Sequence, residues 1–137
     1  MAEDHGFTHQ IRVRYGDCDM QGVVFNPHYF AYVDDAMDTW LLATLGENYL
    51  ERFDYMVKKA SIEWFAPARA RDVVDLRPAV TRWGRSSFDV SIALEVGSQL
   101  IARADLLLIS VKPGAHEPQA VPETVRRALG SEETVRT

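Results

Sequence analysis

Five segments of the chain have the apolar spacing and length expected of β-strands. The expected strands are Thr8–Tyr15, Tyr55–Phe65, Val73–Trp83, Phe88–Val96 and Leu100–Val111. The clearest alternation lies in Phe88–Val96, where apolar residues alternate with Asp89, Ser91, Ala93 and Glu95. Pro78 interrupts the third segment and cannot donate a ladder hydrogen bond, so we expect it at a sheet edge or a bulge.

A segment with the apolar spacing of a helix lies between the first expected strand and the second. It runs from Pro27 to Leu45, with Asn26 as the expected N-cap and Gly46 as the stop. Apolar residues follow the helical spacing at Tyr29, Val33, Ala36, Met37, Trp40, Leu41 and Leu45. A short helix is expected between Pro122 and Gly130.

This order of elements predicts an α+β protein in which an antiparallel sheet covers the apolar face of one long helix. We expect one domain over residues 1–137, with residues 1–7 and 131–137 frayed. Because such a sheet has free edges, a homodimer or homotetramer is expected.

Composition narrows the function classes. The net charge of −5 argues against nucleic acid as a partner, and the absence of a long apolar run or secretory segment argues against a membrane. The single Cys18 allows no internal disulfide and fits a reducing cytoplasm. Because His5, His9 and His116 lack metal-ligand spacing, we predict no metal; no cofactor is implied either.

The loop before the long helix carries the candidate chemistry. Asp17 and Asp19 lie just ahead of a helix N-terminus, where free N–H groups can polarise a carbonyl oxygen. A carboxylate beside a polarised carbonyl indicates a hydrolase. Cys18 lies between the two aspartates but has no histidine near it in sequence, so we interpret it as a packing residue.

The same loop and helix resemble a known family. The matching residues are Tyr15, Gly16, Asp17, Cys18, Asp19, Gly22, Val23, Val24, Asn26, Pro27, Tyr29, Tyr32, Asp34 and Ala36. Further matches follow in order at Trp64, Pro67, Ala68, Asp72, Trp83, Arg85, Ser87 and Phe88. Together they resemble the 4-hydroxybenzoyl-CoA thioesterase family of hotdog-fold acyl-CoA thioesterases, from about Thr8 to Val111.

The resemblance implies a hotdog fold, with a long central helix wrapped by an antiparallel sheet of about five strands, and an acyl-CoA substrate. It implies that Asp19 is the catalytic carboxylate, as nucleophile or general base, and that the Asn26 backbone N–H polarises the thioester carbonyl. It also implies that Arg85 lies near the coenzyme A phosphates. The other implied substrate-binding residues are Gly22, Val24, Phe25, Pro27, His28, Tyr29 and Ser87.

Alternatives remain at this point. Asp17 is the competing carboxylate, although holding the loop by hydrogen bonds is the better interpretation of it, and Asp34 is a reserve candidate on the helix. A hotdog hydratase or dehydratase would need a histidine paired with the carboxylate, and the Asp19 loop contains none. A non-catalytic acyl-thioester binding module is the third possibility.

Overall fold

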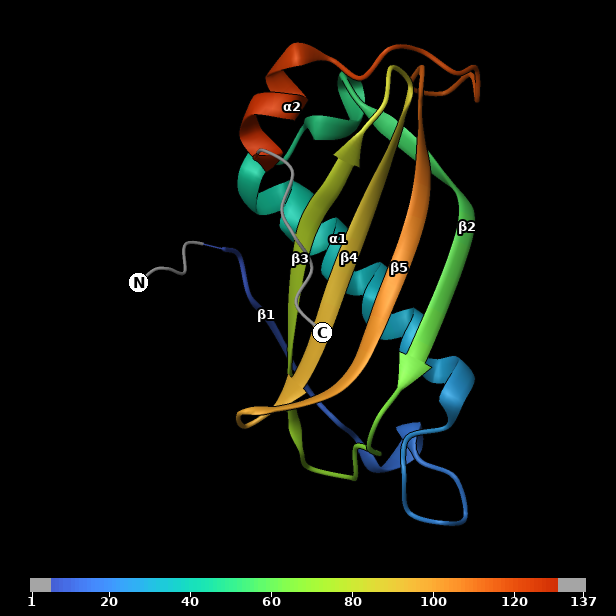
Figure 1. Cartoon of the computed structure of the whole chain (residues 1–137), viewed down its shortest axis with the longest axis vertical. Coiled ribbons are helices and arrows are strands. Elements are labelled where there is room, and N and C mark those ends of the chain that lie inside the picture. The colour runs from blue at the N-terminus through green and yellow to red at the C-terminus, as the bar shows by residue number, and fades with distance from the viewer. Residues whose placement is uncertain (1–5, 131–137) are drawn as a thin grey trace. The chain divides into compact units, whose positions relative to one another are not determined.

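Five strands form one antiparallel sheet in the order β1-β3-β4-β5-β2 in the computed structural model, which describes residues 6–130 (Figure 1). The strands are β1 (His9–Arg12), β2 (Asp54–Trp64), β3 (Val73–Trp83), β4 (Ser87–Val96) and β5 (Gln99–Val111). The helices are α1 (Tyr29–Leu45) and α2 (Glu123–Leu129). The expected fraying of residues 1–5 and 131–137 concerns positions outside the described residues.

The prediction of a strand up to Tyr15 is wrong, because β1 ends at Arg12. The chain bends into a 3₁₀ turn at Tyr15–Asp17, and the Asp17 carboxylate accepts the Arg14 N–H at 3.0 Å. Val13 nevertheless stays beside the start of β3, since its N–H donates to the Asp72 carbonyl at 2.8 Å. A local side-chain acceptor therefore ends the strand earlier than its apolar pattern predicts.

Pro78 lies where the sequence places it, on an open stretch of β3. The β1–β3 ladder runs from His9 opposite Leu76 to Arg12 opposite Val73, so β1 does not reach Pro78. β3 continues to Trp83 without β1 beside it. The missing N–H of proline consequently costs no bond on that side.

The start of the long helix differs from the prediction. A 3₁₀ turn, Asn26–His28, leads directly into α1, and Phe25, not Asn26, is the N-cap residue. No side chain caps this turn, so the expected capping role of Asn26 is wrong. Pro27 occupies an early position, where the lack of an N–H is tolerated. Gly46 ends α1 as expected, with a φ of 98°.

The chain divides into two units, and both contain parts of α1 and of the sheet. Unit 1 comprises Met1–Trp40, Ile62–Pro78 and Ile92–Ala104, and its core includes Tyr29, Val33, Met37, Leu76, Ile92, Leu94 and Ile101. Unit 2 comprises the remaining segments, and its core includes Leu41, Phe53, Phe88, Val90, Leu108 and Val125. Each such buried side chain stabilises the fold by roughly 1.5–3 kcal/mol.

Some of the candidate site residues lie in unit 1 and others lie in unit 2. The loop with Asp17, Asp19 and Asn26 belongs to unit 1, and the turn with Arg85 belongs to unit 2. No helix among residues 6–130 is long and apolar enough to cross a membrane.

Candidate active site

The loop from Asp17 to Phe25 is a small hairpin. Cys18 forms an antiparallel bridge with Val24, and the Asp19 N–H donates to the Val23 carbonyl at 2.9 Å. The Phe25 N–H donates to the Asp17 carbonyl at 3.1 Å. These bonds fix the register of the hairpin, so Asp19 lies opposite Val23. Val23 is three residues before Asn26.

The side chain of Asp19 is exposed at the turn of this hairpin. Its Oδ1 accepts the Gln21 N–H at 2.9 Å, and its carbonyl accepts the Gly22 N–H at 3.0 Å. Gly22 has a φ of 80°, a conformation in which a side chain is strained. The glycine therefore permits the tight turn that holds Asp19 in place.

The backbone N–H of Asn26 opens the helical segment. Within residues 6–130 it donates to no protein acceptor, since the first bond of this turn runs from His28 N to Phe25 O at 2.8 Å. The Asn26 carbonyl, in contrast, accepts the Tyr29 N–H. The first N–H groups of a helical segment lack internal partners, and α1 adds the field of its positive end. This amide can therefore donate to an external oxygen.

Asp17 is buried, with 4% of its surface exposed, and is surrounded by donors. Its carboxylate accepts the Tyr32 hydroxyl at 2.8 Å and the Arg14 N–H at 3.0 Å, and its Oδ1 lies 3.0 Å from His28 Nε2. The His28 and Tyr32 rings also meet edge to face at 5.2 Å. Asp17 thus connects the hairpin to the first turns of α1, which agrees with the interpretation that it holds the loop.

These contacts change the acidity of the buried groups. Burial alone would raise the pKa of Asp17, but hydrogen bonds from Arg14 and Tyr32 and the charges of His28 and Arg14 outweigh burial, so the pKa is lowered from 3.8. Burial and the Asp17 carboxylate raise the pKa of the Tyr32 hydroxyl. Asp17 is therefore held as a carboxylate, and Tyr32 as a neutral donor.

Val24 and Tyr29 form hydrogen bonds with Ala68, in the segment that follows β2. The Val24 N–H donates to the Ala68 carbonyl at 2.9 Å, and the Tyr29 hydroxyl accepts the Ala68 N–H at 3.1 Å. Both side chains are buried, and the Tyr29 ring lies 6.0 Å from that of Trp64. Of the residues implied to bind substrate in unit 1, Gly22, Phe25 and Pro27 are exposed and His28 is half-buried.

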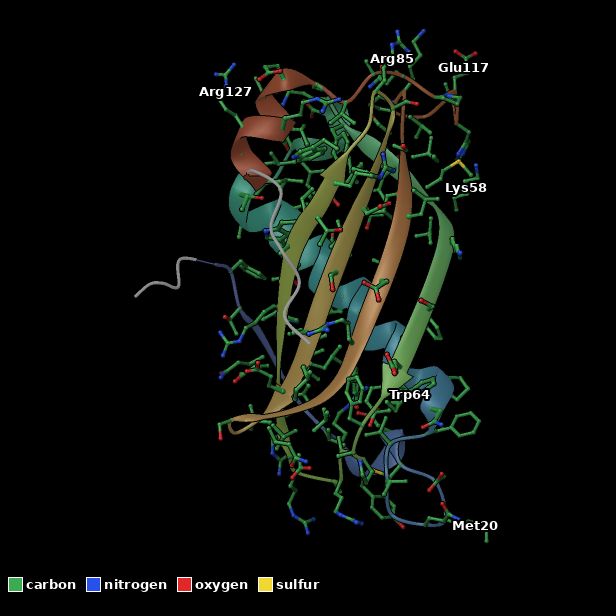
Figure 2. All side chains as sticks on the ribbon, viewed as in Figure 1. Met20, Lys58, Trp64, Arg85, Glu117 and Arg127 are labelled. Carbon is green, nitrogen blue, oxygen red and sulfur yellow. The ribbon has the colours of Figure 1, made fainter. Side chains whose placement is uncertain are left out.

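Arg85 and Ser87 lie in unit 2, at the turn between β3 and β4. The Arg85 side chain is exposed and points away from the protein (Figure 2). Its carbonyl accepts the Val121 N–H at 2.8 Å. Ser87 Oγ accepts a hydrogen bond from Arg82 at 3.1 Å, so Ser87 helps to shape the turn.

Tyr32, the partner of Asp17 within α1, was not among the residues predicted for the site. Residues four apart share one face of a helix, so the spacing of His28 and Tyr32 places them together, but it does not place that face against Asp17. The Cys18 Sγ lies 3.8 Å from the Arg14 carbonyl, to which its thiol can donate. Among residues 6–130, no three His, Cys, Asp or Glu side chains gather as a metal site would require.

Sheet order, long helix and preceding loop together define a hotdog-fold protein. Among solved structures, the PA5185 protein from Pseudomonas aeruginosa strain PAO1 has a TM-score of 0.81 and 27% identity, covering 90% of this chain and 88% of that one. A gentisyl-coenzyme A thioesterase, BH1999, has a TM-score of 0.78 and 23% identity, covering 90% and 98%. The expected hotdog architecture is therefore confirmed.

The comparison of sequences gives the family. The chain belongs to the Thioesterase-like superfamily, which it matches over residues 13–129. The acyl-CoA thioester hydrolase YbgC of Escherichia coli O6:H1 is 28% identical over 123 residues, covering 87% of this chain and 92% of that protein. The expectation of a thioester hydrolase is thereby confirmed at the level of the family.

Proposed function

We propose that the protein is an acyl-CoA thioesterase that hydrolyses an acyl- or aroyl-CoA thioester to the carboxylic acid and coenzyme A. The name of the similar YbgC protein supports the coenzyme A thioester as substrate. The motif around Asp19 supports a relationship to the 4-hydroxybenzoyl-CoA thioesterase type. The single Cys18, free in this structure, fits the cytoplasm as the compartment.

The observation that carries the proposal is an exposed carboxylate at the turn of a short hairpin that leads directly to a free amide. Asp19 stands at its turn, and the Asn26 N–H, which has no acceptor within residues 6–130, follows its second strand. A thioester carbonyl oxygen that accepts the Asn26 N–H becomes more electrophilic at carbon. The helix that follows adds to this polarisation.

Two routes of attack fit this arrangement. In the first, an Asp19 oxygen adds to the carbonyl carbon, the C–S bond breaks, and water hydrolyses the resulting mixed anhydride. In the second, Asp19 takes a proton from water, whose oxygen adds to the carbon before the thiolate leaves. In both routes the negative charge that develops on the carbonyl oxygen is stabilised by the Asn26 N–H.

The direct test is thiol release from a panel of aromatic and aliphatic acyl-CoA compounds. We expect turnover of at least one class, with kcat/KM in the range usual for enzymes, about 10⁴ M⁻¹s⁻¹ or more. Binding of coenzyme A without thiol release from any compound would favour the non-catalytic binding module.

One observation favours a second candidate, a hotdog hydratase or dehydratase. His28 Nε2 lies 3.0 Å from the Asp17 carboxylate, which is the kind of pair that such chemistry needs. However, that carboxylate also accepts bonds from Tyr32 and Arg14, so its oxygens are already engaged. Loss of an enoyl-CoA chromophore without thiol release would identify this activity in place of the thioesterase.

We propose that the protein forms a homodimer or homotetramer through β2. This strand is an edge of the sheet and exposes Met56 and Val57 by 45% and 51%. An exposed edge with apolar side chains favours pairing with a second copy. Light scattering at micromolar concentration should therefore give at least twice the 15.5 kDa chain mass.

The matched variants for assembly are Val57→Asp and Thr124→Asp, both at exposed positions. A carboxylate at position 57 should shift the protein toward monomer, whereas one at position 124, on α2, should leave the mass unchanged. A monomeric wild-type protein would contradict the proposed assembly.

Arg85→Ala should raise KM for acyl-CoA by about tenfold at low salt, the loss of one charge-assisted hydrogen bond, and leave kcat unchanged. The reason is that a phosphate contact remote from the reacting carbon stabilises ground and transition states equally. An acyl-pantetheine thioester lacks the nucleotide phosphates and should be hydrolysed as before. The KM defect should shrink as salt rises. Equal effects on both thioesters would make Arg85 an ordinary surface residue.

A further inference from the structure

The helix α2 holds the backbone of the turn between β3 and β4. One terminal nitrogen of Arg126, Nη2, donates hydrogen bonds to the carbonyls of Gly84 and Arg85, the latter at 3.1 Å. Just before α2, the Val121 N–H donates to the same Arg85 carbonyl at 2.8 Å. The main chain at Arg85 is thus fixed by the segment 121–126, far along the sequence.

The Arg126 side chain is itself supported. Its guanidinium lies over the ring of Trp83, 5.3 Å from the centroid, an attraction of a cation to an aromatic face. The Trp83 indole N–H donates to the Gly130 carbonyl at 3.1 Å, at the end of α2. A guanidinium is planar and rigid, so its two carbonyl partners keep a set geometry.

The turn has no room for a side chain at Gly84. A Cβ at Gly84 would lie 2.7 Å from Ser87 Oγ and 3.0 Å from the Ser87 carbonyl oxygen. The Gly84 N–H donates to that same carbonyl at 2.7 Å, and the Ser110 N–H donates to the Ser86 carbonyl at 2.7 Å. Each residue from 84 to 87 therefore has at least one backbone N–H or carbonyl group in a hydrogen bond with another residue.

We infer that Arg126 is a positioning residue of the coenzyme A site, which holds the turn so that Arg85 presents its guanidinium to a substrate phosphate. This inference rests on the proposed function and on the role proposed there for Arg85. Arg126 acts through the backbone: with its terminal nitrogen bound to two carbonyls and its plane against Trp83, it is engaged by the protein. Its removal should leave Arg85 charged and its carbonyl bound to the Val121 N–H alone, so that the turn and the Arg85 side chain are less restricted.

The test compares Arg126→Met with Arg127→Met as a matched control, since Arg127 is the next residue and its side chain is 74% exposed. Arg126→Met should raise KM for acyl-CoA about fivefold, part of the effect of losing Arg85 itself, with kcat and the acyl-pantetheine reaction unchanged. Arg127→Met should change none of these quantities. Arg126→Lys, which keeps a charged donor, should restore part of the lost affinity.

A double-variant cycle separates positioning from direct contact. If Arg126 acts through Arg85, the Arg85→Ala/Arg126→Met protein should have the KM of Arg85→Ala alone. A KM increase equal to the product of the two single increases would overturn the inference, because Arg126 would then bind phosphate independently. A fall in kcat for acyl-pantetheine in Arg126→Met would also overturn it. Should Arg126→Met fail to fold, Arg126→Lys serves in the same cycle.

The outcome is distinguishable from failure of the proposed function. Absence of thiol release from every acyl-CoA would refute the thioesterase, and a normal KM in Arg85→Ala would refute the phosphate contact. A raised KM in Arg85→Ala with a normal KM in Arg126→Met would refute the positioning role alone.

Discussion

Asp19→Asn should lower thioester turnover by about a hundredfold or more, the usual scale for losing a positioned base or nucleophile. The amide keeps the size of the side chain and can still accept the Gln21 N–H, so the hairpin turn should persist. Binding of acyl-CoA should therefore change little, and the loss should appear in kcat. Initial rates of thiol release over a range of substrate concentrations measure both quantities.

Two further variants act as controls for Asp19. Asp34→Asn, at an exposed position on α1, should retain activity. Abolished turnover in Asp17→Asn together with retained turnover in Asp19→Asn would show that the wrong carboxylate has been assigned. In a single turnover in ¹⁸O-labelled water, label that enters the Asp19 carboxylate indicates the anhydride route, because the general-base route places the water oxygen only in the product acid. Label found only in the product acid does not separate the routes, since an anhydride opened at its acyl carbon gives the same result.

Asp17→Ala should lower the free energy of unfolding by about 3 kcal/mol, because it leaves several donors without their acceptor. The Tyr32 hydroxyl loses a 2.8 Å bond, the Arg14 N–H loses a 3.0 Å bond, and His28 loses the carboxylate beside it. Urea unfolding of both proteins at neutral pH measures the difference. Tyr32→Phe, which removes one of these donors and keeps the ring, should cost less. Equal stability of Asp17→Ala and wild type would mean that the network contributes nothing.

The same carboxylate predicts a pH dependence. Because the pKa of Asp17 is lowered in the folded protein from 3.8, the folded state favours the ionised form more strongly than the unfolded state does. This stabilisation is complete above the unfolded pKa of about 4 and is lost as the pH falls through the lower folded pKa. The stability difference between wild type and Asp17→Asn should therefore shrink below about pH 4. A difference that stays constant down to pH 2 would contradict the lowered pKa.

Periodicity predicted most of the fold because each strand and helix has its own local signal. The long helix and the succession of β3, β4 and β5 needed no distant information. The order at the two ends of the sheet was not predicted, because β1 lies next to β3 and β2 lies next to β5, and these pairs join strands that do not follow one another in the chain. Errors arose at the ends of elements. The strand up to Tyr15 and the Asn26 cap were predicted from local preference, and a carboxylate two residues beyond Tyr15 decided the first of them differently.

The candidate site was predictable only as far as its motif is continuous in sequence. Asp19 and Asn26 lie seven residues apart and could be singled out from one stretch. The contact of Tyr32 with Asp17 depends on how α1 returns beside the hairpin, and the contact of Arg126 with the turn spans more than forty residues. Such contacts depend on tertiary packing, which no local pattern contains.

The two edges of the sheet differ in how much backbone they offer to another chain. On one side, the four residues of β1 leave part of β3 uncovered, and Pro78 provides no N–H there. On the other side, β2 offers eleven residues. If β2 pairs with β2 of a second copy, as proposed, both β2 edges are covered in that contact. The edges that remain exposed are those formed by the short strand β1 and by the part of β3 that contains Pro78. Sheet extension then stops at two subunits, so the fold carries its own protection against filament growth.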